Sequence, residues 1–239
     1  MRNFLKALPS LWSARAIRVP ILMYHYIRVN PYPEDRASAT LSVTPDAFAA
    51  QMAYLAQNRY TSITLDTLYD IFKKRQSPPV KPVVLTFDDG YLDFYLNAYP
   101  ILQRYNFQAV SFVSTGGVGQ KRYLCWNQIR EMQSSGLILF EAHTVTHPNL
   151  TKLRYPELLD ELQGCKNTLQ AQTGRIVHFI SYPYGRTNSL VMSAARKVGF
   201  IGGLGTWYGK TRYPSMNMPR IEIIGQMTLR AFAGRVSSK

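Results

Sequence analysis

Two pairs of reactive side chains stand out in the sequence because of their spacing. Asp88 and Asp89 are adjacent and precede Gly90, and two of the four histidines, His143 and His147, lie four residues apart. Adjacent carboxylates repel each other and are costly to bury unless a cation or a proton separates their roles. One Asp with two His residues is a common ligand set for a catalytic metal ion. The spacing therefore favours a metal site over the alternatives, a surface turn and two hydrogen-bonded histidines.

Two further residues are candidates for the same site. His25 follows an apolar run, and its side chain titrates near neutral pH, as a general acid requires. Tyr184 lies between Pro183 and Gly185, which together fix its backbone, so its N–H could stabilise a developing negative charge. Considered alone, each segment is also compatible with a packed histidine or an ordinary turn.

These residues follow segments that read as buried strands. Such strands are predicted at 21–24, 83–87, 109–113, 137–140, 177–181 and 200–204. Helices are predicted between them, beginning after the capping residues Thr44 and Thr64 and covering 95–105, 126–135, 156–172 and 189–198. This alternation predicts a parallel sheet covered by helices, and the length favours a barrel-like arrangement with fewer than eight complete units. In such folds the polar residues that follow the strands meet at one edge.

The chain is strongly basic. It has 28 Lys and Arg against 14 Asp and Glu, which gives a net charge of +14. The net positive charge is concentrated in residues 1–20, which carry +4, and in residues 205–239, which carry +5. This distribution suits an anionic membrane face or an acidic cell-wall polymer, although it also serves solubility. No helix-turn-helix, zinc-finger or RNA-binding motif accompanies the charge, so specific nucleic-acid binding is not predicted.

The domain organisation is simple. We expect a basic N-terminal segment, 1–19, followed by one domain, 20–239. The N-terminal segment lacks the continuous apolar stretch of about 7–15 residues found in secretory signals, and no apolar run of about 18 residues predicts a membrane-spanning helix. The two cysteines, Cys125 and Cys165, allow one disulfide or none.

Together the motifs resemble those of the polysaccharide deacetylase family, which contains the NodB homology domain. The segment TFDDG at 86–90 matches its first motif, HTVTH at 143–147 its second, and YPYG at 182–185 a form of its third. The resemblance extends over about residues 20–225. It implies an α/β fold, a distorted and incomplete (β/α) barrel, and a hydrolase that removes N-acetyl groups from amino sugars of a polysaccharide or glycoconjugate.

The resemblance also implies roles for individual residues. Asp89, His143 and His147 would hold one divalent metal ion, usually Zn²⁺, and Asp88 would act as the general base. The backbone N–H of Tyr184 would stabilise the oxyanion. By family analogy, the substrate would lie in the cell envelope or outside the cell.

The sequence departs from the common family pattern in two places. The Arg that many members carry near Ser181 is absent, and Arg220 is the candidate replacement. No histidine follows His178, whereas many members have a catalytic histidine late in the chain. Tyr24-His25 is instead similar to the first-strand segment of poly-N-acetylglucosamine deacetylases, which implies that His25 is the general acid.

Two questions stay open at this level. Trp207 and Tyr208 are candidates for stacking on a sugar, and Arg220 is a further candidate for substrate binding. The missing Arg also leaves an alternative function, a catalytically silent carbohydrate-binding protein. The polymer and the oligomeric state are not specified by the sequence.

Overall fold

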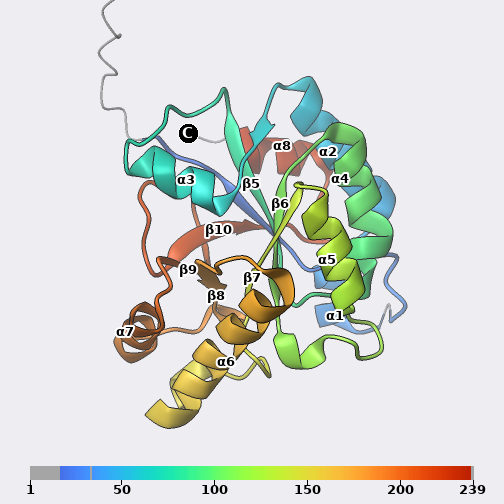
Figure 1. The fold of residues 1–239 in the computed structure, drawn as a ribbon. Helices are drawn as coiled ribbons and strands as arrows, with labels where there is room; N and C mark the ends of the chain where they lie inside the picture. Colours follow the sequence, from blue (N-terminus) through green and yellow to red (C-terminus); the bar gives the residue numbers. More distant parts are fainter. Residues whose placement is uncertain (1–16, 33, 238–239) are drawn as a thin grey trace, which may run out of the picture.

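The computed structural model describes residues 17–32 and 34–237. Most of the predicted N-terminal segment, 1–19, lies outside these residues. The described chain forms a barrel in which the named strands pair in parallel (Figure 1). Around the barrel the strands are β1 (Ile21–Tyr24), β10 (Met218–Glu222), β9 (Gly202–Tyr208), β8 (Phe179–Ser181), β7 (Ile138–Ala142), β6 (Ala109–Val113) and β5 (Pro82–Phe87).

Pairing between β1 and β5 closes the barrel at seven strands. This confirms the predicted incomplete (β/α) barrel, because a complete barrel of this type has eight strands. The short strand β4 (Thr61–Ser62) pairs with the beginning of β5. A separate parallel pair is formed by β2 (Tyr26–Ile27) and β3 (Ser42–Val43).

Helices surround the barrel (Figure 1). They are α1 (Arg36–Leu41), α2 (Pro45–Gln57), α3 (Leu65–Phe72), α4 (Tyr99–Tyr105), α5 (Trp126–Ser134), α6 (Tyr155–Thr173), α7 (Ser189–Val198) and α8 (Leu229–Ser237). The Thr44 and Thr64 side chains accept hydrogen bonds from the first turns of α2 and α3, as predicted. Gly174 and Gly199 end α6 and α7 with positive φ, where a side chain would be strained.

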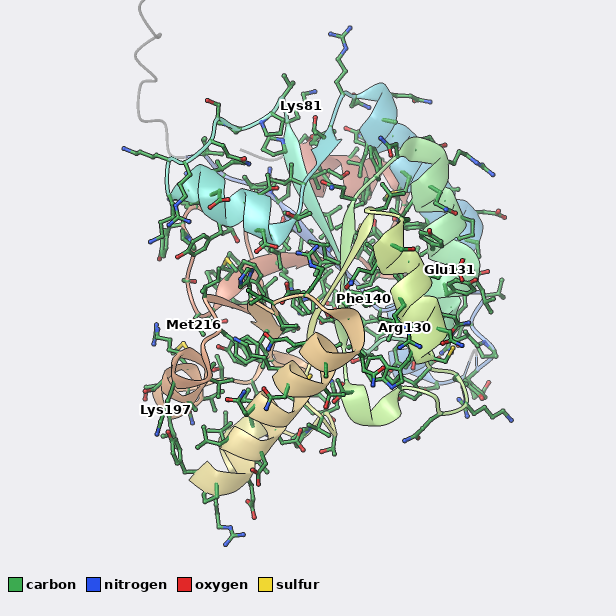
Figure 2. All side chains as sticks on the ribbon, in the orientation of Figure 1. Lys81, Arg130, Glu131, Phe140, Lys197 and Met216 are labelled. Atoms are coloured by element: carbon green, nitrogen blue, oxygen red, sulfur yellow. The ribbon has the colours of Figure 1, made fainter. Side chains whose placement is uncertain are left out.

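The core has two parts. Apolar side chains of the strands and of α3 form the smaller part, which includes Val84, Val110, Leu139, Leu204 and Leu68. The larger part lies between the strands and the other helices. Lys81, labelled in Figure 2, immediately precedes β5 and marks the end of that strand opposite to Asp88.

Several boundaries differ from those predicted. Strand β7 continues through Glu141 and Ala142, while β8 begins at Phe179 rather than Val177. One oxygen of the Glu141 carboxyl group accepts the backbone N–H groups of His178 and Phe179, which replaces part of the strand pairing there. Strand β9 runs later than predicted, from Gly202 to Tyr208.

Two general expectations can be compared with the described residues. Cys125 and Cys165 are both free thiols. Among the helices that the structure describes, none combines the length and apolar character needed to cross a bilayer.

Candidate active site

The two adjacent aspartates lie where β5 ends, and they make contact with different partners. Asp88 is 4% exposed, and Asp89 has a φ of 75°, in the left-handed region. Gly90 continues the turn with a φ of 78°, and an added Cβ there would lie 3.1 Å from a methyl group of Val113. This turn allows one carboxylate to contact a buried arginine while the other contacts the two histidines.

The predicted ligand set comes together in space. An Oδ1 atom of Asp89 lies 3.1 Å from Nε2 of His143 and 3.3 Å from Nε2 of His147. The potential ligand atoms of these three residues all lie within 4.8 Å of one another. His147 has a φ of 59°, so the HTVTH segment turns sharply before Pro148 and brings both imidazoles to one place.

The orientation of His143 fits a metal ligand. Its Nδ1 lies 2.7 Å from the carbonyl oxygen of Ser181, which can only accept a hydrogen bond. Nδ1 therefore carries the proton, and in the neutral ring the lone pair is on Nε2, which is directed at Asp89. An anionic carboxylate and two imidazole nitrogens form an oxygen and nitrogen donor set suited to Zn²⁺ and other divalent transition metals. The residues present thus fit the expected ion.

The pKa values of the two imidazoles shift in opposite directions. Burial opposes protonation of His143, but its contact with Asp89 raises its pKa overall. Burial and the neighbouring His143 lower the pKa of His147. His143 therefore takes up an additional proton more readily than His147 does.

Asp88 is held by a second charged group. Both carboxylate oxygens accept hydrogen bonds from Arg220, at 2.8 and 2.7 Å, and the Ser181 hydroxyl donates to the same carboxylate at 3.1 Å. Burial alone would raise the pKa of Asp88, but Arg220 lowers it below its usual range. Asp88 is therefore an oriented, ionised carboxylate beside the ligand set.

Arg220 is fully buried, and this corrects its assignment as a substrate-binding residue. Its guanidinium also donates to the carbonyl of Gly205 at 2.8 Å and to Ser181 at 2.9 Å. These contacts occupy the side chain and separate it from solvent. The structure places Arg220 where an arginine can orient Asp88, although it comes from β10 and is distant from Ser181 in the sequence.

His25 lies close enough to the site to influence its charges. Its positive form lowers the pKa of Asp88, Asp89 and His147. Its Nδ1 is buried and has no hydrogen-bond partner among the described residues. The strand that follows is anchored at Ile27, whose N–H donates to Asp93 at 2.9 Å and whose carbonyl accepts from Asn97 at 2.7 Å.

Tyr184 borders the cavity in which Asp89 and His147 are accessible. This cavity has a volume of about 430 Å³ and is also lined by Tyr91 and Tyr123. Tyr184 has a φ of 59°, and its ring lies 4.7 Å from that of His147. The strained backbone is consistent with an N–H held in a fixed direction, as the Pro and Gly on either side predict.

The sequence did not reveal the residues that support the histidine segment. Glu161 of α6 accepts the backbone N–H groups of Val145 and Thr146 at 2.8 and 2.9 Å, together with the Thr146 hydroxyl. The Ser114 hydroxyl donates to the carbonyl of His143. A glutamate on an amphipathic helix has no distinctive sequence signal, and only the fold brings it to this loop.

The remaining candidates lie elsewhere. Trp207 and Tyr208 line a different cavity, which shares no lining residue with the one at Asp89. His178 precedes β8, and its Nδ1 lies 2.6 Å from Asp66 of α3. That contact agrees with a structural role for His178.

Comparisons with known proteins agree with this arrangement. Residues 75–202 match the family model described as "Polysaccharide deacetylase". YxkH of Bacillus subtilis, which is named as a polysaccharide deacetylase, is 31% identical over 96% of this chain and 80% of its own length. The poly-β-1,6-N-acetyl-D-glucosamine N-deacetylase of Staphylococcus aureus is 30% identical over 74% of this chain and 68% of its own length.

Solved structures show the same similarity. The Streptococcus pyogenes deacetylase PplD, solved in complex with acetate, is 32% identical and matches 93% of this chain and 99% of its own with a TM-score of 0.86. The polysaccharide deacetylase BC0361 of Bacillus cereus is 30% identical and matches 92% of this chain and 69% of its own with a TM-score of 0.83. The motifs, the barrel and these similarities together establish that the chain belongs to the polysaccharide deacetylase family.

Proposed function

We propose that this chain is a metal-dependent hydrolase that removes N-acetyl groups from the amino sugars of a polysaccharide or glycoconjugate. The main observation behind the proposal is that a metal-ligand set and a separate, oriented carboxylate lie side by side at the end of β5. Asp89 joins His143 and His147 in one ligand set, while Asp88 stays outside that set and is oriented by Arg220. A site that only bound metal would have no need of the second carboxylate.

Asp89, His143 and His147 would hold the divalent ion, for which Zn²⁺ is the first candidate. When bound, such an ion lowers the pKa of water and withdraws electrons from a carbonyl group. The residues of the chain supply the other requirements, which are a base, an acid and a donor for the oxyanion.

Asp88 acts as the general base. It removes a proton from the attacking water as the water oxygen bonds to the acetyl carbon, and Arg220 and Ser181 hold its carboxylate during this transfer. The N–H of Tyr184 donates to the oxygen of the acetyl group as that oxygen becomes negative. His25 then gives a proton to the amine nitrogen as the carbon–nitrogen bond breaks. The products are acetate and a free amino sugar.

The names of similar proteins support this choice of substrate. The Staphylococcus aureus relative is named for poly-β-1,6-N-acetyl-D-glucosamine, and the Streptococcus pyogenes deacetylase was solved with acetate. We therefore propose N-acetylated glycans of the cell envelope or of the extracellular space as substrates. The basic surface of the chain suits an anionic membrane or cell-wall polymer close to that substrate.

The alternative function, a catalytically silent carbohydrate-binding protein, was favoured by the missing Arg near Ser181. Arg220 supplies a guanidinium to Asp88 from another strand. This contact removes the main argument for a silent site, and we propose the enzyme.

The test is acetate release from oligomers of β-1,6- and β-1,4-linked N-acetylglucosamine, measured with and without a chelator. We expect release that stops on metal removal and returns on addition of Zn²⁺. Asp88→Asn should abolish release while the protein still binds one equivalent of metal. Chelator-resistant release would exclude the metal, and full activity of Asp88→Asn would exclude Asp88 as the base.

A further inference from the structure

A second cavity lies beside β9, where the connection to the next barrel strand has no α-helix. The other crossings between successive barrel strands contain an α-helix, whereas residues 209–217, between β9 and β10, contain none. The cavity at this place has a volume of about 460 Å³. We call it the β9 pocket; among its lining residues are Arg18, Trp207, Tyr208, Lys210, Arg212, Tyr213 and Asn217.

The β9 pocket presents three large aromatic side chains to solvent. Trp207, Tyr208 and Tyr213 are 53%, 60% and 69% exposed. The Trp207 indole N–H lies 3.2 Å from the side-chain oxygen of Asn217 and 3.3 Å from its carbonyl oxygen, so this ring is held in place. Exposed aromatic surface gathered in one concavity is typical of a binding site, because a ligand is needed to remove it from water.

The β9 pocket is also positively charged. Arg18, Lys210 and Arg212 line it, and no Asp or Glu is among its lining residues. In the described part of the chain, no hydrogen bond or ion pair is made by Arg18 or Arg212. Burial lowers the pKa of Lys210, and the positive charge of Arg18 lowers it further. The Lys210 ammonium donates to the carbonyl oxygen of Val236 at 2.6 Å, which leaves Arg18 and Arg212 as the cations available to a ligand.

We propose that the β9 pocket binds an anionic saccharide, with a sugar ring stacked on Trp207 and a carboxylate or phosphate group paired with Arg18 and Arg212. Aromatic faces match the C–H face of a sugar ring, and guanidinium groups match planar or tetrahedral anions. A concave pocket of this size suits a sugar residue better than a flat bilayer surface.

The position of the β9 pocket relates it to the first cavity. Thr206, which precedes Trp207, lies against Gly185, and an added Cβ on that glycine would be 2.1 Å from the Thr206 hydroxyl. Gly185 follows Tyr184, which borders the cavity at Asp89. Strand β9 therefore connects the β9 pocket to the loop that borders the proposed active site, and binding in the pocket requires no turnover.

Calorimetric titration of the full, metal-containing chain with hexagalacturonate tests the proposal. This probe has no N-acetyl group, so its binding is independent of de-N-acetylation. Its fully methyl-esterified form has the same rings without charge and is the matched ligand. We expect the acid to bind more tightly than the ester. Arg212→Gln and Trp207→Ala should each weaken binding of the acid by about tenfold or more, as for loss of one charge-assisted contact or one stacked ring.

Control variants make the result specific to the β9 pocket. Arg104→Gln removes the same charge from an exposed site on α4, and we expect it to bind as the unaltered protein does. Trp207→Phe keeps an aromatic face and should retain most of the affinity. Equal losses in Arg104→Gln and Arg212→Gln would reduce the effect to net charge and overturn the proposal. Absence of binding, or stronger binding to phosphatidylglycerol vesicles through the same residues, would also overturn it.

Discussion

At the scale of single residues, the central feature is that two neighbouring carboxylates have different partners and different proposed roles. Asp88 and Asp89 are adjacent in the chain, yet one contacts Arg220 and the other contacts His143 and His147. The positive φ of Asp89 turns the backbone between them. The two residues are of the same type, so the different chemistry of each carboxylate is determined by its partner.

Arg220 provides the first prediction. Arg220→Gln should lower kcat/KM for acetate release by about 10²–10³-fold, because Asp88 loses the donors that orient it. Metal content should be unchanged, since Arg220 touches none of the proposed ligands. Arg220→Lys keeps the charge but not the paired hydrogen bonds, so its kcat/KM should lie between those of the unaltered protein and of Arg220→Gln. Activity and metal content are measured on protein shown to be folded by circular dichroism. Loss of metal together with activity would contradict the assigned role.

His25 provides a prediction that depends on the leaving group. His25→Asn should reduce hydrolysis of an N-acetyl amino sugar by about 10²–10⁴-fold, because the departing amine needs a proton. Hydrolysis of 4-nitrophenyl acetate should change much less, since nitrophenolate departs without one. The two rates are compared in the same preparation.

His178→Asn is the matched control, because His178 contacts Asp66 rather than the proposed active site. We expect it to leave the ratio of the two rates unchanged. An equal loss on both substrates in His25→Asn would rule out protonation of the leaving group as its function.

The residues found from the sequence are those that share a short motif. Adjacency identified Asp88 and Asp89, and spacing identified His143 and His147. Arg220 was a candidate only because a familiar arginine was missing. Glu161 and Ser181 carried no signal at all, because their contribution depends on strands and helices that meet only after folding.

At the scale of elements, the sequence predicted helix boundaries correctly where a boundary depends on only a few neighbouring residues. Thr44 and Thr64 cap helices through their own side chains, and Gly174 and Gly199 end helices through their own backbone, so each boundary is encoded within a few residues. Strand β10 was missed, because Met218–Glu222 contains a proline and two charged residues in five positions. Within it, the buried charge of Arg220 is compensated by Asp88 of another part of the barrel, which the local sequence does not reveal.

Helix α6 supports the proposed metal site from outside, and this gives an element-scale prediction. Glu161→Gln should weaken metal binding by about 10–100-fold. The variant lacks the negative charge that holds the backbone N–H groups of Val145 and Thr146, which lie between the two histidines. The affinity is measured by competition with a chelator of known strength. Activity at saturating metal should change less than the affinity does.

Glu157→Gln is the matched control on the same helix. Glu157 pairs with Arg154 at the exposed start of α6 and does not contact the histidine segment. We expect its metal affinity to equal that of the unaltered protein. If both variants lose metal equally, stability of α6 explains the effect and Glu161 has no specific part in the site.

At the scale of the whole molecule, the barrel contains charge as well as apolar side chains. Arg220 and Asp88 form a fully buried pair between β10 and the end of β5. Glu141 of β7 is 2% exposed, and its contacts with the His178 and Phe179 backbone bridge to β8. A buried ion pair keeps both partners charged, whereas burial of a carboxyl without a cationic partner favours its neutral form.

Glu141 therefore links the stability of the barrel to pH. Burial raises the pKa of Glu141 from 4.5 to about 8, although the Phe179 N–H opposes the shift. The folded state thus keeps a proton that the unfolded state releases. This contribution to stability is complete below pH 4.5 and is lost as the pH rises through about 8.

Glu141→Gln tests this linkage, because an amide oxygen can still accept the two N–H groups but cannot ionise. We expect similar unfolding free energies for the two proteins at pH 4, and a loss on the order of a few kcal/mol in the unaltered protein by pH 8 that the variant does not show. Urea unfolding followed by circular dichroism at several pH values gives the unfolding free energy of each protein. Subtracting one from the other removes the effect of all groups that titrate in both. Parallel pH profiles would show that Glu141 is ionised in the folded barrel and that its backbone contacts, rather than a retained proton, stabilise the joint between β7 and β8.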